Sequence, residues 1–469
     1  MKIALVCGDG LPVSGLLTVF RNVLDSPPGR QLVERPVPAD LGYSWRPDKP
    51  AFYPDGGPAP AHPDWLAVST GPAVADPAAH AAELTALRDL VAVADSLDDT
   101  ARAALHQRIE TAAAPYQRYF ADWFERQGAD WVVAVNMTLS DAVPVTLALH
   151  RAAAERWAGR PGRLVFWDHD LLGSYAVHEG DHRVYPVAPN EFTPLPGSAP
   201  GHRWAVVSEP LAKEAVGYPT PLAPEYLPNP LPTVPAGMEL RHHAFLDRIG
   251  AGPDRPVLLC PVRVFRVKGV EISVALHAAV VRSARERGVP VPLLLVFGAL
   301  GEDPEYTEEV LAAVAAHGLA PDVRFLDGVP LSSRHDATGH WCPDEIDLLR
   351  ICAGTGGGVL FTPNRPDVES VGLGPALAAL VKVPCASTAY QVLDEVYGPS
   401  FRQIRVDPAD PASAGPAFAE LLALRRSGDP ATLAALDHNH EVVRRRFPDT
   451  PWHDLLHDLH RRLTQESTS

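Results

Sequence analysis

The stretch Pro-Val-Leu-Leu-Cys-Pro-Val-Arg-Val-Phe-Arg-Val-Lys-Gly-Val, residues 256–270, joins a short apolar run to a cluster of cations. Residues 256–260 have the length and composition of a buried strand, and residues 270–286 have helical spacing. Arg263 and Lys268 lie five positions apart in the turn between them. An arginine can bind a diphosphate through two parallel hydrogen bonds, a lysine adds a point charge, and amides at a helix N-terminus add donors. We therefore expect these two cations to bind a phosphate-bearing ligand; solvent-exposed surface charge is the alternative.

The rest of the second half alternates strand and helix. Strands are predicted at 291–297, 323–326, 357–361 and 383–386, with helices at 270–286, 305–317, 344–352 and 374–381. Such alternation predicts an α/β fold with a parallel, doubly wound sheet whose ligands bind beyond the carboxyl ends of the strands.

The first half follows the same plan. Residues 2–7 predict a strand, 8–15 a loop and 16–24 a helix, and further strands are predicted at 130–135, 163–167 and 204–207, the last followed by Ser208 as the N-cap of a short helix. The proline-rich segment 40–63 predicts a loop insertion, and prolines between 219 and 235 interrupt regular structure. We expect an N-terminal domain at 1–235, a C-terminal domain at 236–440, and a C-terminal helix at 441–469 that packs back on the N-terminal domain.

Composition narrows the class of protein. Arg and Lys total 41 and Asp and Glu total 57, for a net charge of −16, which disfavours nucleic acid as a partner. No apolar stretch is long enough to span a membrane, and the first ten residues do not resemble a signal peptide. The five cysteines are sparse and odd in number, as in reduced cytosolic proteins. We expect a cytoplasmic protein without membrane insertion, and the scarcity of lysine is typical of a GC-rich actinobacterial genome; the oligomeric state is left open.

A second informative segment follows the predicted strand at 357–361. Glu369 lies in a loop there, and Gly372, Leu373 and Gly374 lead into the next helix. Loop amides at a helix start can bind an anion, and a carboxylate beside them can accept hydrogen bonds from sugar hydroxyls.

The two segments together resemble the C-terminal domain of retaining nucleotide-sugar glycosyltransferases of family four. This family has the GT-B architecture, in which two Rossmann-like parallel-sheet domains face a central cleft. Arg263, Lys268 and Gly269 match the family's diphosphate-binding residues, and the later motif is matched at the positions Pro363, Glu369, Gly372, Leu373 and Pro384. The resemblance implies that Gly269, Gly372, Leu373 and Gly374 border the donor and that Glu369 contacts the transferred sugar.

Two positions depart from the family pattern. A second glutamate, which holds the nucleotide ribose in the family, is replaced by Leu377, and a glycine is replaced by Lys382. Leucine cannot accept a hydrogen bond from a ribose diol. The chain therefore resembles a diverged member.

The first half resembles the family more faintly. Gly10 and Gly15 match its donor-binding loop, and His169 matches a histidine that lies over the donor sugar. Asp168, Asp170 and His178 are candidates for the acceptor side. His169 as a local hydrogen-bond partner, and His178 in an ordinary surface loop, are the alternatives.

Two metal-binding readings are weaker. Asp168-His169-Asp170 also spells the Asp-any-Asp metal motif of another glycosyltransferase fold, and His335, His340 and Cys342 could suggest zinc. The zinc cluster lacks a fourth ligand nearby, and Arg263 with Lys268 already supplies positive charge for a diphosphate. We expect no metal and no cofactor.

The resulting functional hypothesis is transfer of a sugar from a nucleotide-diphospho-sugar to a small acceptor, with retention of anomeric configuration, in natural-product biosynthesis. Arg263, Lys268, Glu369 and His169 are the predicted catalytic residues. The alternatives are a noncatalytic GT-B-like binding protein, an inverting transferase, or a nucleotide-sugar epimerase.

Overall fold

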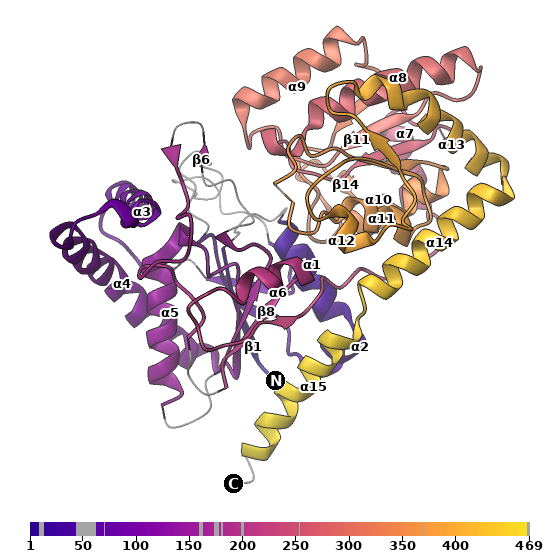
Figure 1. Cartoon of the computed structure of the whole chain (residues 1–469). Helices are drawn as coiled ribbons and strands as arrows, with labels where there is room; N and C mark the ends of the chain where they lie inside the picture. The colour runs from indigo at the N-terminus through magenta and orange to yellow at the C-terminus, as the bar shows by residue number, and fades with distance from the viewer. Residues whose placement is uncertain are drawn as a thin grey trace. The chain divides into compact units, whose positions relative to one another are not determined.

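The computed structural model describes residues 1–8, 14–43, 62–69, 71–158, 163–172, 178–179, 182–197, 201–252, 254–367 and 369–466. The chain divides into two compact units (Figure 1). Unit 1 comprises Met1–Pro230 and Asp449–Ser469, and unit 2 comprises Leu231–Pro448. The first division falls five residues before the predicted boundary at 235.

Unit 1 is built on a seven-stranded parallel sheet with the order β3-β2-β1-β4-β5-β8-β9. Its strands are β1 (Ile3–Cys7), β2 (Val37–Leu41), β3 (Leu66–Ser69), β4 (Trp131–Val135), β5 (Leu164–Asp168), β8 (Arg203–Val206) and β9 (Glu225–Tyr226), and β6 (His178–Glu179) pairs with β7 (His182–Arg183) in a separate hairpin. Its helices are α1 (Gly15–Asp25), α2 (Pro27–Leu32), α3 (Pro77–Ala92), α4 (Asp99–Gln127), α5 (Val143–Arg156), α6 (Glu209–Ala215) and α15 (Thr450–Glu466).

The C-terminal helix α15 is part of unit 1. Trp452 lies in its first turn and donates a hydrogen bond from Nε1 to the Pro228 carbonyl at 3.0 Å. Its ring also meets Trp167 of β5 edge to face, with 4.5 Å between centroids. The chain thus returns to unit 1 after unit 2, and it does so beyond Pro448, where α14 (Pro430–Arg446) has ended and α15 has not begun.

Unit 2 contains a six-stranded parallel sheet with the order β12-β11-β10-β15-β16-β17. Its strands are β10 (Val257–Cys260), β11 (Leu293–Val296), β12 (Val323–Phe325), β15 (Gly358–Phe361), β16 (Cys385–Thr388) and β17 (Ile404–Val406), with a small hairpin of β13 (Arg334–His335) and β14 (Trp341–Cys342). Its helices are α7 (Leu240–Arg248), α8 (Val270–Glu286), α9 (Pro304–Ala316), α10 (Glu345–Gly354), α11 (Gly374–Leu380), α12 (Leu393–Tyr397), α13 (Gly415–Ser427) and α14.

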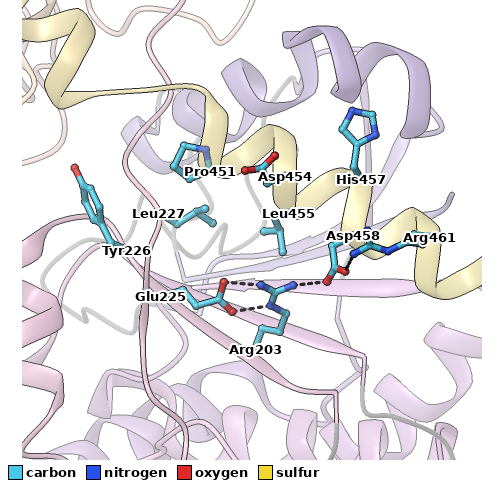
Figure 2. A pocket seen from close by; sticks show the side chains of 10 residues that line it. All are labelled: Arg203, Glu225, Tyr226, Leu227, Pro451, Asp454, Leu455, His457, Asp458 and Arg461. Atoms are coloured by element: carbon cyan, nitrogen blue, oxygen red, sulfur yellow. Dashed lines mark hydrogen bonds and ion pairs between the residues drawn. The ribbon is translucent and has the colours of Figure 1, made fainter.

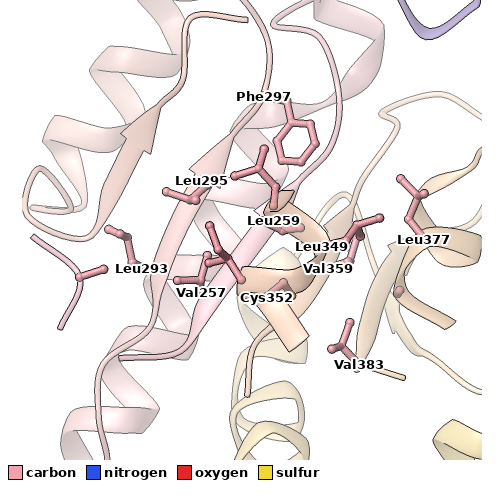
Figure 3. Close-up of a cluster of buried hydrophobic side chains, with 14 of the residues drawn as sticks. Val257, Leu259, Leu293, Leu295, Phe297, Leu349, Cys352, Val359, Leu377 and Val383 are labelled. Carbon is pink, nitrogen blue, oxygen red and sulfur yellow. The ribbon is translucent and has the colours of Figure 1, made fainter. Parts of the chain in front are cut away.

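The central strands of unit 2 are apolar on both faces because helices cover both sides of a doubly wound sheet. Val257 and Leu259 of β10 pack in one cluster with Leu293 and Leu295 of β11 and with side chains of α10 (Figure 3). This packing fixes the carboxyl ends of β10 and β15, where the predicted phosphate and sugar residues begin.

The predicted alternation of strands and helices is confirmed in both units, with strand ends shifted by one or two residues. Ser208 caps α6 as predicted, its Oγ accepting from the amide of Leu211 at 3.4 Å. The predicted insertion at 40–63 begins too early, because β2 extends to Leu41; residues 44–61 lie outside the described part of the chain. None of the described helices is both long enough and apolar enough to cross a bilayer.

Candidate functional site

The connection from β10 to α8 carries the predicted phosphate-binding residues. Arg266–Lys268 forms one turn of 3-10 helix, and Gly269 follows in the left-handed region with φ of 60°. A Cβ atom on Gly269 would lie 2.0 Å from the carbonyl oxygen of Thr362, so only glycine fits. The packing explains why a glycine follows Lys268, independently of any ligand.

Hydrogen bonds hold this connection against the segment that follows β15. The Thr362 hydroxyl donates to the Gly269 carbonyl at 2.8 Å, and the Asn364 side-chain amide donates to the Arg266 carbonyl at 2.6 Å. The Asn364 backbone amide also donates to the Val267 carbonyl. Two segments almost 100 residues apart in sequence therefore form one rigid surface at the carboxyl ends of neighbouring strands.

Every cation of the connection pairs with a carboxylate. Lys268 Nζ lies 2.6 Å from Glu369 Oε1, so the structure brings these two predicted residues together. Arg263 pairs with Glu302, whose side chain is only 2% exposed, and Arg266 pairs with Glu309 at the surface. The local positive charge expected from the sequence is therefore largely neutralised by neighbouring glutamates.

The glycine loop after Glu369 is held by aromatic side chains. Gly372 has a φ of 68°, and a Cβ atom there would lie 2.5 Å from the hydroxyl of Tyr390. The Tyr397 hydroxyl donates to the Gly372 carbonyl at 2.5 Å. A Cβ atom on Gly374 would overlap the ring of Phe361. Both glycines thus have packing roles in unit 2, and Leu373 lies between them as the residue before α11.

The two departures from the family pattern have distinct structural settings. Leu377 of α11 is buried in the apolar cluster of unit 2 (Figure 3), so its side chain has no access to a polar ligand. Lys382 has a φ of 54°, a left-handed conformation at the position where the family has glycine. Its ammonium pairs with Asp437 at the surface, 2.8 Å away.

In unit 1, the predicted residues Asp168, His169 and Asp170 lie at the carboxyl end of β5. Asn136, which follows β4 with a φ of 53°, accepts at Oδ1 from the His169 amide at 2.6 Å. It also donates from Nδ2 to Asp170 Oδ2 at 3.0 Å. One asparagine therefore fixes the backbone and a carboxylate at this end of the sheet.

Burial shifts the pKa values of two side chains in this group, Asp168 and His169, in opposite directions. Burial raises the pKa of the Asp168 carboxyl to about 7, although Trp204 Nε1 donates to its Oδ2 at 2.8 Å. Burial lowers the pKa of His169 to about 3, so its imidazole is neutral at pH 7. His169 therefore supplies no positive charge at that pH.

Three predicted residues remain. Gly10 lies outside the described residues, and Gly15 is the first residue of α1. His178 lies in β6, where only its backbone is described.

The residues of the zinc reading sit on and beside the β13–β14 hairpin. His340 Nδ1 bonds to the Thr338 hydroxyl at 2.7 Å. Within the described ranges, no group of three or more His, Cys, Asp or Glu side chains is arranged to hold a metal ion.

A pocket of about 570 Å³ lies in unit 1, and none of the side chains that line it belongs to a predicted site residue (Figure 2). It is bordered by β8, β9 and α15, and Arg203 at its base pairs with both Glu225 and Asp458. Arg461, which also lines the pocket, pairs with Asp458 as well, so both arginines are already neutralised by carboxylates of the same unit.

Sequence reasoning missed Glu302, Asn136, Asn364 and Tyr397. Glu302 is the carboxylate partner of Arg263, and the other three hold the loops that carry predicted residues. An asparagine directly after a buried strand is one signal that could have indicated Asn136. Glu302 has no comparable signal, because it lies six residues beyond β11 in an unremarkable acidic loop.

The chain resembles known proteins in its structure but not detectably in its sequence. No family model matches the sequence, and no curated protein matches it significantly. The sucrose-phosphate synthase from Thermosynechococcus elongatus is similar with a TM-score of 0.56 and 15% identity, covering 99% of this chain and 100% of that one. WaaG, a glycosyltransferase involved in lipopolysaccharide biosynthesis, gives 0.53 and 14%, covering 96% and 98%. Anabaena HepE in complex with UDP-glucose gives 0.54 and 11%, covering 98% and 99%. The chain therefore has the GT-B fold, with two Rossmann-like units, that is found in known glycosyltransferase structures.

Proposed function

We propose that the protein transfers a glycosyl unit from a nucleotide-diphospho-sugar to a small acceptor, with retention of anomeric configuration. The observation that carries this proposal is the contact between Lys268 and Glu369. It places a cation suited to phosphate beside a carboxylate suited to sugar hydroxyls, at the carboxyl ends of β10 and β15. A donor that has a sugar attached to a diphosphate needs both groups side by side.

The roles follow from the chemistry of glycosyl transfer. The bond between the anomeric carbon and the diphosphate oxygen breaks, and negative charge grows on the leaving phosphate. Arg263 and Lys268 would stabilise that charge, and a preorganised donor of this kind can contribute about 3 to 4 kcal/mol. The first amides of α8 are not available for this role, because those of Val270 and Glu271 donate to the Tyr306 hydroxyl. The leaving phosphate would take the proton of the acceptor as the new bond forms on the same face, so no enzymic nucleophile is needed.

Glu369 would hold the hydroxyls of the transferred sugar. In unit 1, we assign neutral His169 to contact with the sugar, and Asp170 to the acceptor. Fully buried Asp168 is better suited to support β5 than to contact an acceptor, because its carboxyl bonds inward to Trp204. We further propose a natural-product acceptor and no metal or other cofactor.

The first experiment is a thermal-shift panel with UDP, GDP, ADP and dTDP and their sugar conjugates. Ligands that bind the native state raise the melting temperature, so a selective rise identifies the nucleotide. UDP-sugars come first because HepE, which has the same fold, binds UDP-glucose. NMR of the glycosylated product then gives the anomeric configuration. Retention of the anomeric configuration supports the proposal. Inversion would indicate an inverting transferase instead, and an epimerised donor would indicate a nucleotide-sugar epimerase.

A noncatalytic sugar- or nucleotide-binding protein is the second candidate. It is favoured by the burial of Leu377 at the family's ribose-binding position and by the neutralised cations of unit 2. Donor binding without turnover, tested against a broad acceptor library and water, would support this alternative.

A further inference from the structure

The Lys268–Glu369 ion pair differs from the two other ion pairs of the same connection. In the pair of Arg263 with Glu302, the glutamate side chain is only 2% exposed. In the pair of Arg266 with Glu309, both side chains are about half exposed. Lys268 and Glu369 lie between these limits, at 25% and 11% exposed. Their ion pair is partly shielded from solvent, yet both groups still reach the surface.

Such an ion pair affects a nucleotide and a sugar nucleotide differently. A nucleoside diphosphate that binds Lys268 must compete with Glu369 for the ammonium and places phosphate charge beside the carboxylate. Like charges at close range in a half-buried site repel one another. The carboxylate also loses its partner, and it gains none from the nucleotide.

A sugar attached to the diphosphate removes this penalty. Its hydroxyls donate to Glu369 and replace the hydrogen bond from Lys268, while the ammonium turns to the phosphate. Glu369 then exchanges one partner for another. When the sugar leaves with the acceptor, the carboxylate again lacks a donor beside a negatively charged diphosphate, and its ion pair with Lys268 can form again.

We propose that the Lys268–Glu369 ion pair selects the sugar nucleotide over the free nucleoside diphosphate and thereby promotes release of the spent nucleotide. This inference rests on the proposed function, because it assumes that a sugar nucleotide binds at these two residues. It adds that Glu369 weakens product binding as well as holding the sugar.

The test is calorimetric titration of the intact protein with a nucleoside diphosphate and with its sugar conjugate, using the nucleotide that the thermal-shift panel selects. The variants are Glu369→Gln, which keeps the size of the side chain, and Glu369→Ala as a second removal of the charge. Asp367→Asn is the matched control, because Asp367 lies two residues away in the same loop and pairs with Arg365 instead. Circular dichroism and melting temperature check that each variant is folded.

We expect Glu369→Gln to tighten binding of the free diphosphate by about tenfold, because it removes a charge that both competes with and repels phosphate. The sugar conjugate should gain no affinity, so the preference for it falls by the same factor. Asp367→Asn should leave the preference unchanged.

The outcomes separate the two proposals. Nucleotide binding that is within about twofold of wild type in both Glu369 variants would overturn the inference while leaving the proposed function in place. Absence of binding by every nucleotide and sugar nucleotide, in wild type and variants alike, would overturn the proposed function and the inference with it.

Discussion

Gly269→Ala tests whether the two segments of the candidate site form one rigid surface. The added Cβ would lie 2.0 Å from the Thr362 oxygen, and ordinary contact begins at 3.4 Å, so the two segments must separate by about 1.4 Å. The left-handed conformation costs a further 1 to 2 kcal/mol, roughly. The separation would also break the hydrogen bond from Thr362 to the Gly269 carbonyl and that from the Asn364 side chain, each contributing about 1 kcal/mol.

We therefore expect Gly269→Ala to lower the free energy of unfolding of unit 2 by about 3 to 4 kcal/mol. Gly288→Ala is the matched control, because Gly288 lies just beyond the other end of α8 with a φ of 62° and its Cβ would meet nothing within 4 Å. It should lower the free energy by only the cost of the left-handed conformation, about 1 to 2 kcal/mol. Urea denaturation followed by circular dichroism measures both values. An equal decrease in unfolding free energy in the two variants would refute the reasoning, because the left-handed backbone conformation alone, without steric overlap, would then account for the whole decrease.

Three further predictions concern unit 2. Arg263→Ala and Lys268→Ala should each reduce turnover at least about 100-fold in steady-state kinetics. Arg266→Ala is the control: Arg266 belongs to the same connection but pairs at the surface, so its turnover should stay within a few fold of wild type. Near-wild-type rates in both of the first two variants would reject the phosphate assignment. Burial lowers the pKa of His277 to about 4, so on acidification below 6.5 the unfolded chain takes up a proton that the folded protein refuses. This imidazole should therefore cost about 2 kcal/mol of unfolding free energy at pH 5 relative to pH 7.5, and urea titrations of His277→Gln should show a flatter pH dependence; an equal slope would contradict this. Tyr397→Phe should destabilise unit 2 by about 1 to 2 kcal/mol and raise the KM for the sugar nucleotide more than it lowers kcat, and an unchanged melting temperature would argue against its hydrogen bond to the glycine loop.

The sequence was sufficient to predict the strands that have a strong apolar pattern. β10, β11, β15 and β4 are fully buried, and their continuous apolar runs are typical of central parallel strands. β2, β3 and β17 were missed for two reasons. Pro38 and Asp40 give β2 an unfavourable composition, and the other two are edge strands with only one buried residue each. Their pairing with neighbouring strands, which tertiary structure supplies, determines that they are extended.

The candidate site was predictable only where residues follow a motif. Lys268 and Glu369 were chosen independently, and their contact across the sheet depends on strand order, which the sequence does not state. The neutralisation of Arg263 by Glu302 depends on how the loop after β11 folds back. Gly269 and Gly372 were interpreted as ligand-bordering residues, and the structure adds a packing reason for each that a motif cannot reveal.

The return of α15 to unit 1 sets an order of events during synthesis. A ribosome makes residues 1–230 first, then all of unit 2, and only then the helix that contributes Trp452 and Asp458 to unit 1. Until that helix emerges, the nascent first unit lacks the indole that packs on Trp167 and the carboxylate that pairs with Arg203. Unit 2, in contrast, has every one of its own elements as soon as residue 448 has left the exit tunnel. The later half of this chain is therefore the first that can finish folding, and premature termination within α15 would leave an unfinished N-terminal unit attached to a finished partner.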